Sequence, residues 1–154
     1  MTNRQEIKNE HENSVKKIID EFIPESGASI LEIMCGSGAF SSFLGKKNNE
    51  VIGVDTDADK IIEARELSND RLDFVCSDYL ELPFDTEQFD ISVCFENFLG
   101  NSLSDCVSIL EELIMVTSEQ LIFYLDSEKD SKKIFEGVLE KVSDDYTSRI
   151  AEIE

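Results

Sequence analysis

The side chains best suited to chemistry surround a glycine-rich turn near the start of the chain. A short apolar run, Ser29 to Ile33, contains the acidic Glu32 and leads into Gly36 and Gly38. Glycine lets a backbone turn tightly and approach a ligand closely, because it has no Cβ. A helix pattern begins at Ala39, and the first N–H groups of a helix have no partner within it. Strand, turn and helix N-terminus together predict a nucleotide-type cofactor site at the carboxyl end of a strand.

A second acidic position follows the next apolar run, Glu50 to Val54. Asp55 ends this run, and an acid at the tip of a second strand can accept hydrogen bonds from both hydroxyls of an adenosine ribose. Thr56 or Asp57 is expected to cap the next helix. Asp57 suits that role better, which leaves Asp55 for a ligand.

The glycine turn alone does not identify the ligand. A dinucleotide fingerprint needs a third glycine where this chain has Ser41, and no Gly-Lys-Ser/Thr follows the turn, which excludes a phosphate-binding P-loop. An ordinary turn between a strand and a helix remains an alternative.

A later stretch, Cys76 to Val93, is more specific. It contains Asp78, a Leu-Pro-Phe turn at 82–84 and the pair Phe89-Asp90. Together with Glu32-x-x-x-Gly36-x-Gly38 and Asp55, it resembles the class I S-adenosylmethionine-dependent methyltransferases over about residues 29–125. This resemblance implies that Asp78 accepts from the adenine amino group while the backbone N–H of Tyr79 reaches the ring. An Asp beside a backbone N–H complements that edge of adenine.

The resemblance implies S-adenosylmethionine as the cofactor. One departure concerns Met34, which stands where the family has its first glycine. A positive φ would strain Met34, whereas with a negative φ it simply lines the pocket. The implied cofactor-binding residues are Glu32, Met34, Gly36, Ser37, Gly38, Asp55, Thr56, Asp78, Tyr79 and Phe95.

The loop after the fourth apolar run, Phe95 to Asn101, is expected to face the reacting groups. Glu96 and Asn97 are the candidate catalytic residues, able to orient a nucleophile or accept its proton. The alternative is a turn whose Asn and Gly residues only set backbone geometry. His11, on the N-terminal helix, is expected to be a solvated residue.

Composition narrows the function classes. The 154 residues suit one domain, and a net charge of −20 disfavours nucleic acid as a partner. There is no apolar run of about 20 residues for a membrane span, and the polar N-terminus does not read as a secretory signal. The four cysteines form no C-x-x-C, and with one histidine no metal site is expected. We therefore expect a cytoplasmic protein with reduced thiols.

The expected fold is a three-layer α/β sandwich with a mainly parallel sheet of order 3-2-1-4-5. We divide the chain into an N-terminal helix (1–24), whose apolar face carries Val15, Ile18, Ile19 and Phe22, a cofactor-binding core (29–125), and a C-terminal helix with a short tail (127–154). The resembled fold has seven strands, and this chain ends where the sixth should begin. Either residues 146–153 or a partner subunit, which can be a second copy of this chain, is expected to cover the exposed edge.

The expected function is methyl transfer from S-adenosylmethionine to a small-molecule or protein nucleophile. Three alternatives stay open: a non-catalytic cofactor-binding subunit or truncated domain that needs a partner, a nicotinamide-dependent enzyme, and a purely structural domain.

Overall fold

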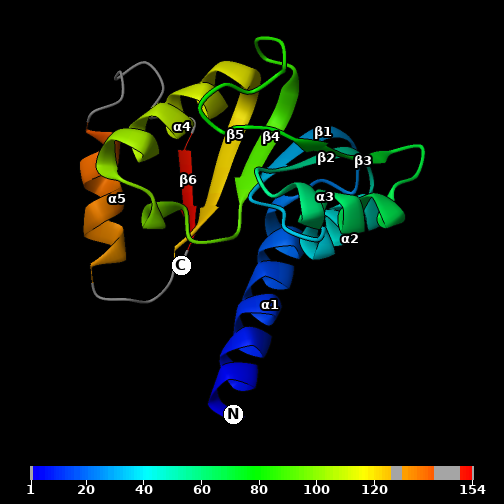
Figure 1. The fold of residues 1–154 in the computed structure, drawn as a ribbon, viewed down its shortest axis with the longest axis horizontal. Helices are drawn as coiled ribbons and strands as arrows, with labels where there is room; N and C mark the ends of the chain where they lie inside the picture. Colours follow the sequence, from blue (N-terminus) through cyan, green and yellow to red (C-terminus); the bar gives the residue numbers. More distant parts are fainter. Residues whose placement is uncertain (1, 126–129, 141–149, 154) are drawn as a thin grey trace.

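The strands form a single parallel sheet. The computed structural model describes residues 2–125, 130–140 and 150–153. In this part of the chain six strands pair in the order β3-β2-β1-β4-β5-β6 (Figure 1). The strands are β1 (Ser26–Ile33), β2 (Asn48–Asp55), β3 (Leu72–Cys76), β4 (Phe89–Cys94), β5 (Thr117–Tyr124) and β6 (Ile150–Ile153). The predicted order of the first five strands is confirmed.

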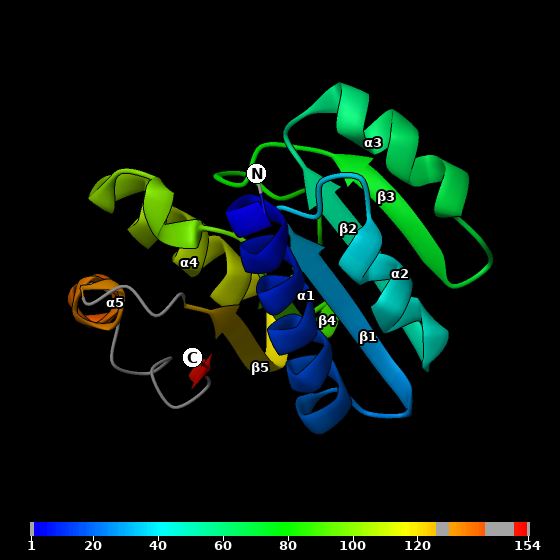
Figure 2. The ribbon, with the colours of Figure 1, turned by 90° about the horizontal axis from the view of Figure 1, so that it is seen from below.

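Helices cover both faces of the sheet, so the three predicted layers are present. Three helices pack on one face and two on the other, and Figure 2 shows α1 lying beside α2 across the strands. The first face carries α1 (Thr2–Phe22), α2 (Ala39–Lys46) and α3 (Ala58–Ala64), and the second carries α4 (Leu103–Val116) and α5 (Ser131–Leu139). Two 3-10 turns, η1 (Arg65–Leu67) and η2 (Phe98–Gly100), complete the described elements.

Each central strand supplies side chains to both cores. Consecutive residues of a strand point to opposite faces, so Ile30 packs under α1 and α2 while Leu31 packs under α4. Both side chains are fully buried, because a parallel sheet covered on two faces has no solvent side. This is why the strands appear in the sequence as continuous apolar runs. Their carboxyl ends meet at one edge of the sheet, where the glycine turn lies.

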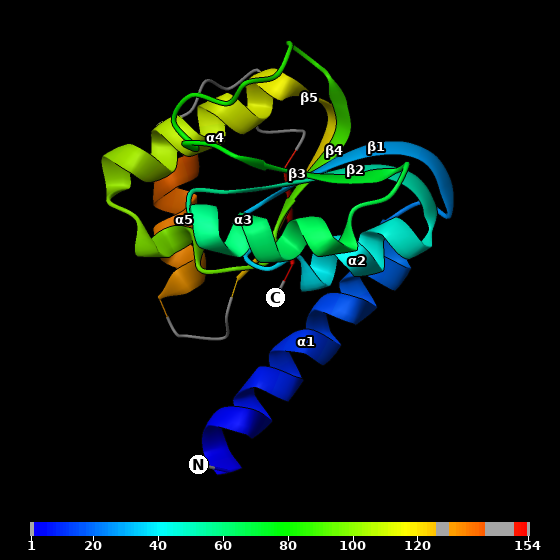
Figure 3. The ribbon, with the colours of Figure 1, turned by 45° about the vertical axis from the view of Figure 1, so that its right-hand side comes forward.

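Helix α1 is attached to the domain mainly through its second half. Val15, Ile18 and Ile19 are buried as predicted, but Phe22 is 38% exposed and Ile23 takes its place in the core. The Lys47 side chain also holds this end, because Nζ donates to the carbonyl oxygens of Ile19 (3.0 Å) and Ile23 (2.9 Å). The amino-terminal half of α1 projects from the body, as Figures 1 and 3 show.

The expectation that the chain ends before a sixth strand is wrong, because residues 150–153 form the strand β6 at the edge of the sheet. The resembled fold ends in an antiparallel edge, whereas β6 pairs in parallel with β5, from Leu121 opposite Ile150 to Tyr124 opposite Ile153. Residues 150–153 therefore cover this length of β5, and the rest of the expected covering segment, 146–149, lies outside the described residues. The expected C-terminal helix is present as α5, Ser131–Leu139, with Asp130 as its N-cap, and residues 127–129 and 141–149 of the predicted C-terminal part lie outside the described residues.

Candidate active site

The glycine turn joins β1 to α2 through three residues with left-handed backbone. The φ angles are 57° at Met34, 55° at Gly36 and 90° at Gly38. Gly38 also needs its missing Cβ, because a Cβ there would lie 2.8 Å from Cζ of Phe74. The backbone N–H of Cys35 donates to the carbonyl oxygen of Val54 (3.1 Å), which ties the turn to the neighbouring strand.

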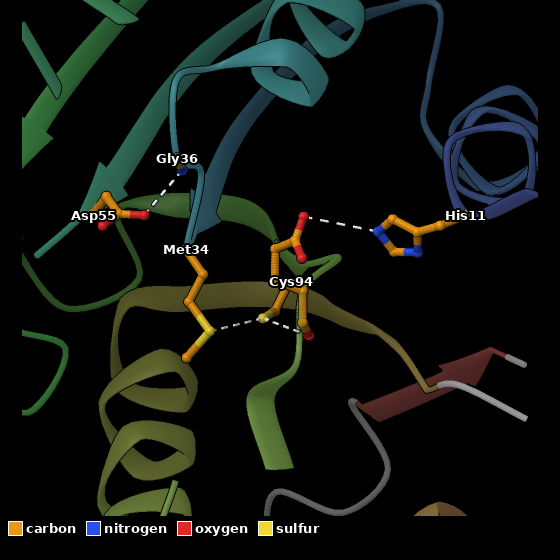
Figure 4. Close-up of polar contacts among 6 residues, drawn as sticks. His11, Met34, Gly36, Asp55 and Cys94 are labelled. Carbon is orange, nitrogen blue, oxygen red and sulfur yellow. Dashed lines mark hydrogen bonds and ion pairs between the residues drawn. The ribbon is translucent and has the colours of Figure 1, made fainter. Parts of the chain in front are cut away.

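Met34 has a positive φ, the first of the two cases that remained open for this position. The residue is therefore strained, at a cost on the order of 1 kcal/mol. Its sulfur lies 3.7 Å from Sγ of Cys94, and Figure 4 shows the side chain extended from the turn toward β4. Met34 thus adopts a backbone conformation that favours glycine and adds its side chain to the wall of the cleft that opens above the turn.

Asp55 stands at the end of β2 and is fixed by two backbone groups. Its Oδ2 accepts from the N–H of Gly36 (2.9 Å, Figure 4) and its Oδ1 from the N–H of Asp57 (2.9 Å). The carboxylate is therefore less free than predicted, but each oxygen retains a second lone pair. Asp57 caps α3 as expected, because its side chain accepts from the N–H groups of Asp59 and Lys60.

Glu32 lies beneath the turn and is 1% exposed. The hydroxyl of Ser41, itself buried, donates to Oε1 of Glu32. Burial raises the pKa of Glu32 to about 8, the charges of Glu96 and Asp55 add to this rise, and the Ser41 hydrogen bond opposes it. At neutral pH the side chain is therefore mainly protonated, and it supports the turn from below.

A cleft of about 820 Å³ opens above the turn. It brings together seven of the predicted site residues, namely Met34, Gly36, Ser37, Asp55, Tyr79, Glu96 and Asn97. Four others, Glu32, Gly38, Thr56 and Asp78, do not line this cleft, and Phe95 lines a second cavity beside it. The binding roles given to these residues stay predictions.

The loop after β3 positions Asp78 and Tyr79 differently. Asp78 is exposed, and its Oδ1 accepts from the N–H of Leu80 (2.9 Å), which fixes a local turn. Tyr79 is half-buried in the wall of the cleft. Burial, and then the nearby Asp55 carboxylate, raises the pKa of the Tyr79 hydroxyl, so it stays protonated and able to donate at neutral pH.

A second cavity of about 400 Å³ adjoins the cleft between α1 and the loop after β4. His11, Glu96 and Asn97 line both spaces, so they form the boundary between them. Nε2 of His11 lies 3.7 Å from Oε1 of Glu96, and the ring packs edge-on against Phe40 and Tyr124 at 5.7 Å and 4.8 Å between centroids. The expectation of a solvated His11 is therefore wrong.

A signal for the position of His11 was present in the sequence. Val15, Ile18 and Ile19 lie four, seven and eight residues after it, which places all four side chains on one face of a helix. The single histidine of the chain thus lies on the helix face that packs against the sheet, one turn before Val15, the first buried residue of that face.

The sequence comparisons agree with this geometry. Residues 30–120 match the family described as methyltransferase domain. The chain belongs to this methyltransferase family. A comparison with curated proteins gives no match.

Solved methyltransferases share the fold of this domain. A TehB-like S-adenosylmethionine-dependent methyltransferase from Corynebacterium glutamicum is 22% identical with a TM-score of 0.65, covering 89% of this chain and 80% of its own. A magnesium protoporphyrin IX methyltransferase from Synechocystis, solved with bound S-adenosylmethionine, is 17% identical with a TM-score of 0.64, covering 84% and 67%. A methyltransferase from Haloferax volcanii, in complex with a methyltransferase activator, is 22% identical with a TM-score of 0.68, covering 86% and 61%.

This chain spans less than two thirds of several solved chains that share its fold, 42% to 64% in four of them. All four cysteines are free, and no cluster of metal-ligating side chains occurs among the described residues. Within residues 2–125, 130–140 and 150–153, no helix combines the length and apolar character needed to cross a membrane.

Proposed function

We propose that this domain transfers a methyl group from S-adenosylmethionine to a small molecule. The observation that carries the proposal is the meeting of two cavities at His11, Glu96 and Asn97. A two-substrate reaction needs two adjacent spaces, one for the methyl donor and one for the acceptor. The larger space lies against the glycine turn and Asp55, where the family has its cofactor.

The residues of the larger cleft suit the proposed cofactor. A cleft of about 820 Å³ lies within the range of small-molecule sites, roughly 300–1,000 Å³. Asp55 has lone pairs for ribose hydroxyls, Gly36 lets the backbone approach closely, and Tyr79 offers a protonated hydroxyl. When bound, S-adenosylmethionine supplies a methyl group on a positively charged sulfur.

The residues between the cavities would act on the acceptor. Glu96 is half-exposed and Asn97 is exposed; both lie after β4 at the carboxyl edge of the sheet. A carboxylate and an amide at this point can orient a nucleophile, and the carboxylate or imidazole can hold its proton. Holding both reactants in line is the main contribution such a site makes to the rate.

The test is calorimetry of the purified chain with S-adenosylhomocysteine, with NAD as the control ligand. We expect micromolar binding of S-adenosylhomocysteine and none of NAD. Asp55→Ala should weaken binding by about ten- to a hundredfold, since it removes one or two hydrogen bonds to the ligand. Asp78→Ala should have an effect of the same size if the adenine extends beyond the cleft to the loop after β3, where Asp78 is exposed. Asp85→Ala, an exposed acid of the same loop as Asp78, is the matched control and should leave affinity unchanged. Binding of NAD instead would support the nicotinamide alternative.

A second candidate is a cofactor-binding domain that works only with a partner. The Haloferax volcanii neighbour, solved with an activator, gives this candidate a precedent, and this chain spans 61% of the matched protein there. The two candidate functions predict different catalytic activity for the isolated chain. The isolated chain would bind S-adenosylhomocysteine in both cases, but only the first would methylate an acceptor without a partner.

A further inference from the structure

The boundary between the two cavities presents two hydrogen-bond acceptors side by side. Nε2 of His11 is buried and has no hydrogen-bond partner among the described residues. Oε1 of Glu96 lies 3.7 Å away, beyond hydrogen-bonding distance (Figure 4). In the tautomer that carries its proton on Nδ1, the imidazole and the carboxylate both offer lone pairs. A single donor group with two or more N–H bonds can therefore satisfy both atoms at once.

The rest of the second cavity favours a cation with an apolar body. Phe95, Phe98 and Leu125, all buried, form apolar wall, and Glu10 adds a further carboxylate. Among the described residues that line this cavity there is no Lys or Arg to pair with an anion. The electrostatics therefore disfavour a carboxylate or phosphate ligand and favour an ammonium group next to Glu96.

We propose that the second cavity binds a small amine with an apolar body, and that this amine is the methyl acceptor. Its ammonium group donates to Oε1 of Glu96 and, after a rotation of the imidazole that exposes the buried Nε2, to His11, while its hydrocarbon part lies among the aromatic residues of the cavity. The acceptor role rests on the proposed function, whereas the amine selectivity rests only on residues of the cavity itself.

The same arrangement gives His11 a step in the reaction. An ammonium nitrogen has no lone pair and must lose a proton before it can act as a nucleophile. One N–H bond breaks, its electron pair stays on the nitrogen, and the proton moves to Nε2 of His11. The imidazolium that forms is stabilised by the Glu96 carboxylate. Proton transfer to a positioned side chain typically contributes 10²- to 10⁴-fold in rate.

Binding of three matched probes tests the selectivity of the cavity. Phenethylamine, 2-phenylethanol and 3-phenylpropionate have similar apolar bodies and carry a cationic, a neutral and an anionic end. Each is titrated into the full chain by calorimetry, with and without S-adenosylhomocysteine. We expect the amine to bind at least about tenfold more tightly than the alcohol and the acid not to bind. Equal affinity for amine and alcohol, or preferential binding of the acid, would overturn the proposal.

Two glutamate variants distinguish a direct contact between Glu96 and the amine from a general effect of the protein's negative charge. Glu96→Gln should weaken phenethylamine by at least about tenfold and leave 2-phenylethanol unchanged. Glu12→Gln removes the same charge from the larger cleft but not from the second cavity, and should leave amine affinity nearly unchanged. Equal effects of the two variants on the amine would contradict a direct contact.

A histidine variant tests the proton step separately from binding. With phenethylamine as acceptor, His11→Gln should lower kcat by about a hundredfold at pH 7 and change KM less than threefold. The difference in kcat between the variant and the wild type should shrink as pH rises, because solvent then deprotonates the amine. The charged and titratable groups facing this site are Lys8, Glu10 and Glu12 of α1, Glu96 after β4 and Tyr124 of β5. A deficit independent of pH would indicate a structural role for His11. Absent binding of S-adenosylhomocysteine would count against the cofactor, while the amine selectivity would still be decided by the three probes.

Discussion

Replacing Glu32 with Gln should remove most of the pH dependence of stability between pH 5.5 and 7.5. Glu32 is almost wholly buried, and its pKa rises from 4.5 in the unfolded chain to about 8 in the folded domain. Between these values the folded state binds more protons than the unfolded state, so stability is greatest at low pH and falls as pH rises. The slope is about 1.4 kcal/mol per pH unit, so the two units cover about 3 kcal/mol.

The assay is urea denaturation of both proteins at pH 5.5, 6.5 and 7.5 and fixed ionic strength. Gln keeps the shape of a neutral carboxyl group and can still accept from Ser41, but it cannot ionise. The difference between the two proteins isolates Glu32 from the other carboxylates, which repel one another more strongly as pH rises. Wild type should lose stability relative to Glu32→Gln as pH increases. Parallel pH profiles would refute the assignment of Glu32 as a carboxyl group that folding keeps protonated.

Three further variants test the turn and the attachment of α1. Met34→Val should destabilise the domain by about 1 kcal/mol more than Met34→Gly, because a β-branched residue tolerates a positive φ poorly; equal urea midpoints would contradict the strain at this position. Gly38→Ala should lower the free energy of unfolding by about 3 kcal/mol, measured by thermal denaturation, because it adds a steric clash to a positive φ. Gly36→Ala has open space around the new Cβ and should lower it by about 1 kcal/mol. The reverse order would contradict the close packing of Gly38 against Phe74. Lys47→Met should speed hydrogen exchange of amides near the end of α1 while Lys46→Met does not; unchanged exchange in both would show that the Lys47 contacts are dispensable.

The sheet and the glycine turn could be predicted because their signals are local. Runs of apolar residues indicate the strands, and glycine at positions 36 and 38 indicates a turn because glycine readily adopts the positive φ found there. The same holds for Asp57, which caps α3 through bonds to residues two and three positions later. Such features depend on neighbours in the chain, so the sequence carries them directly.

The positions that were missed depend on contacts between distant segments. His11 becomes a site residue only because α1 packs across the sheet and brings it to Glu96, 85 positions later in the chain. Nζ of Lys47 likewise reaches the end of α1, 24 and 28 positions earlier in the chain. The burial of Glu32 with Ser41 could not be deduced without the packing of α2 on β1, and its expected contact with the cofactor stays a prediction. No local pattern encodes these contacts.

The one-sided attachment of α1 has a consequence for how this domain can diversify. Ile7 is 59% exposed and Glu10 is also exposed, yet both line the second cavity from the projecting half of the helix. Substitutions at exposed positions usually change stability by less than about 0.5 kcal/mol. Substitutions on this side of the second cavity can therefore change its shape and charge with little loss of stability, while the sheet and the glycine turn stay unchanged. Changes in this half of the helix can in this way alter the second cavity without first requiring stabilising mutations elsewhere.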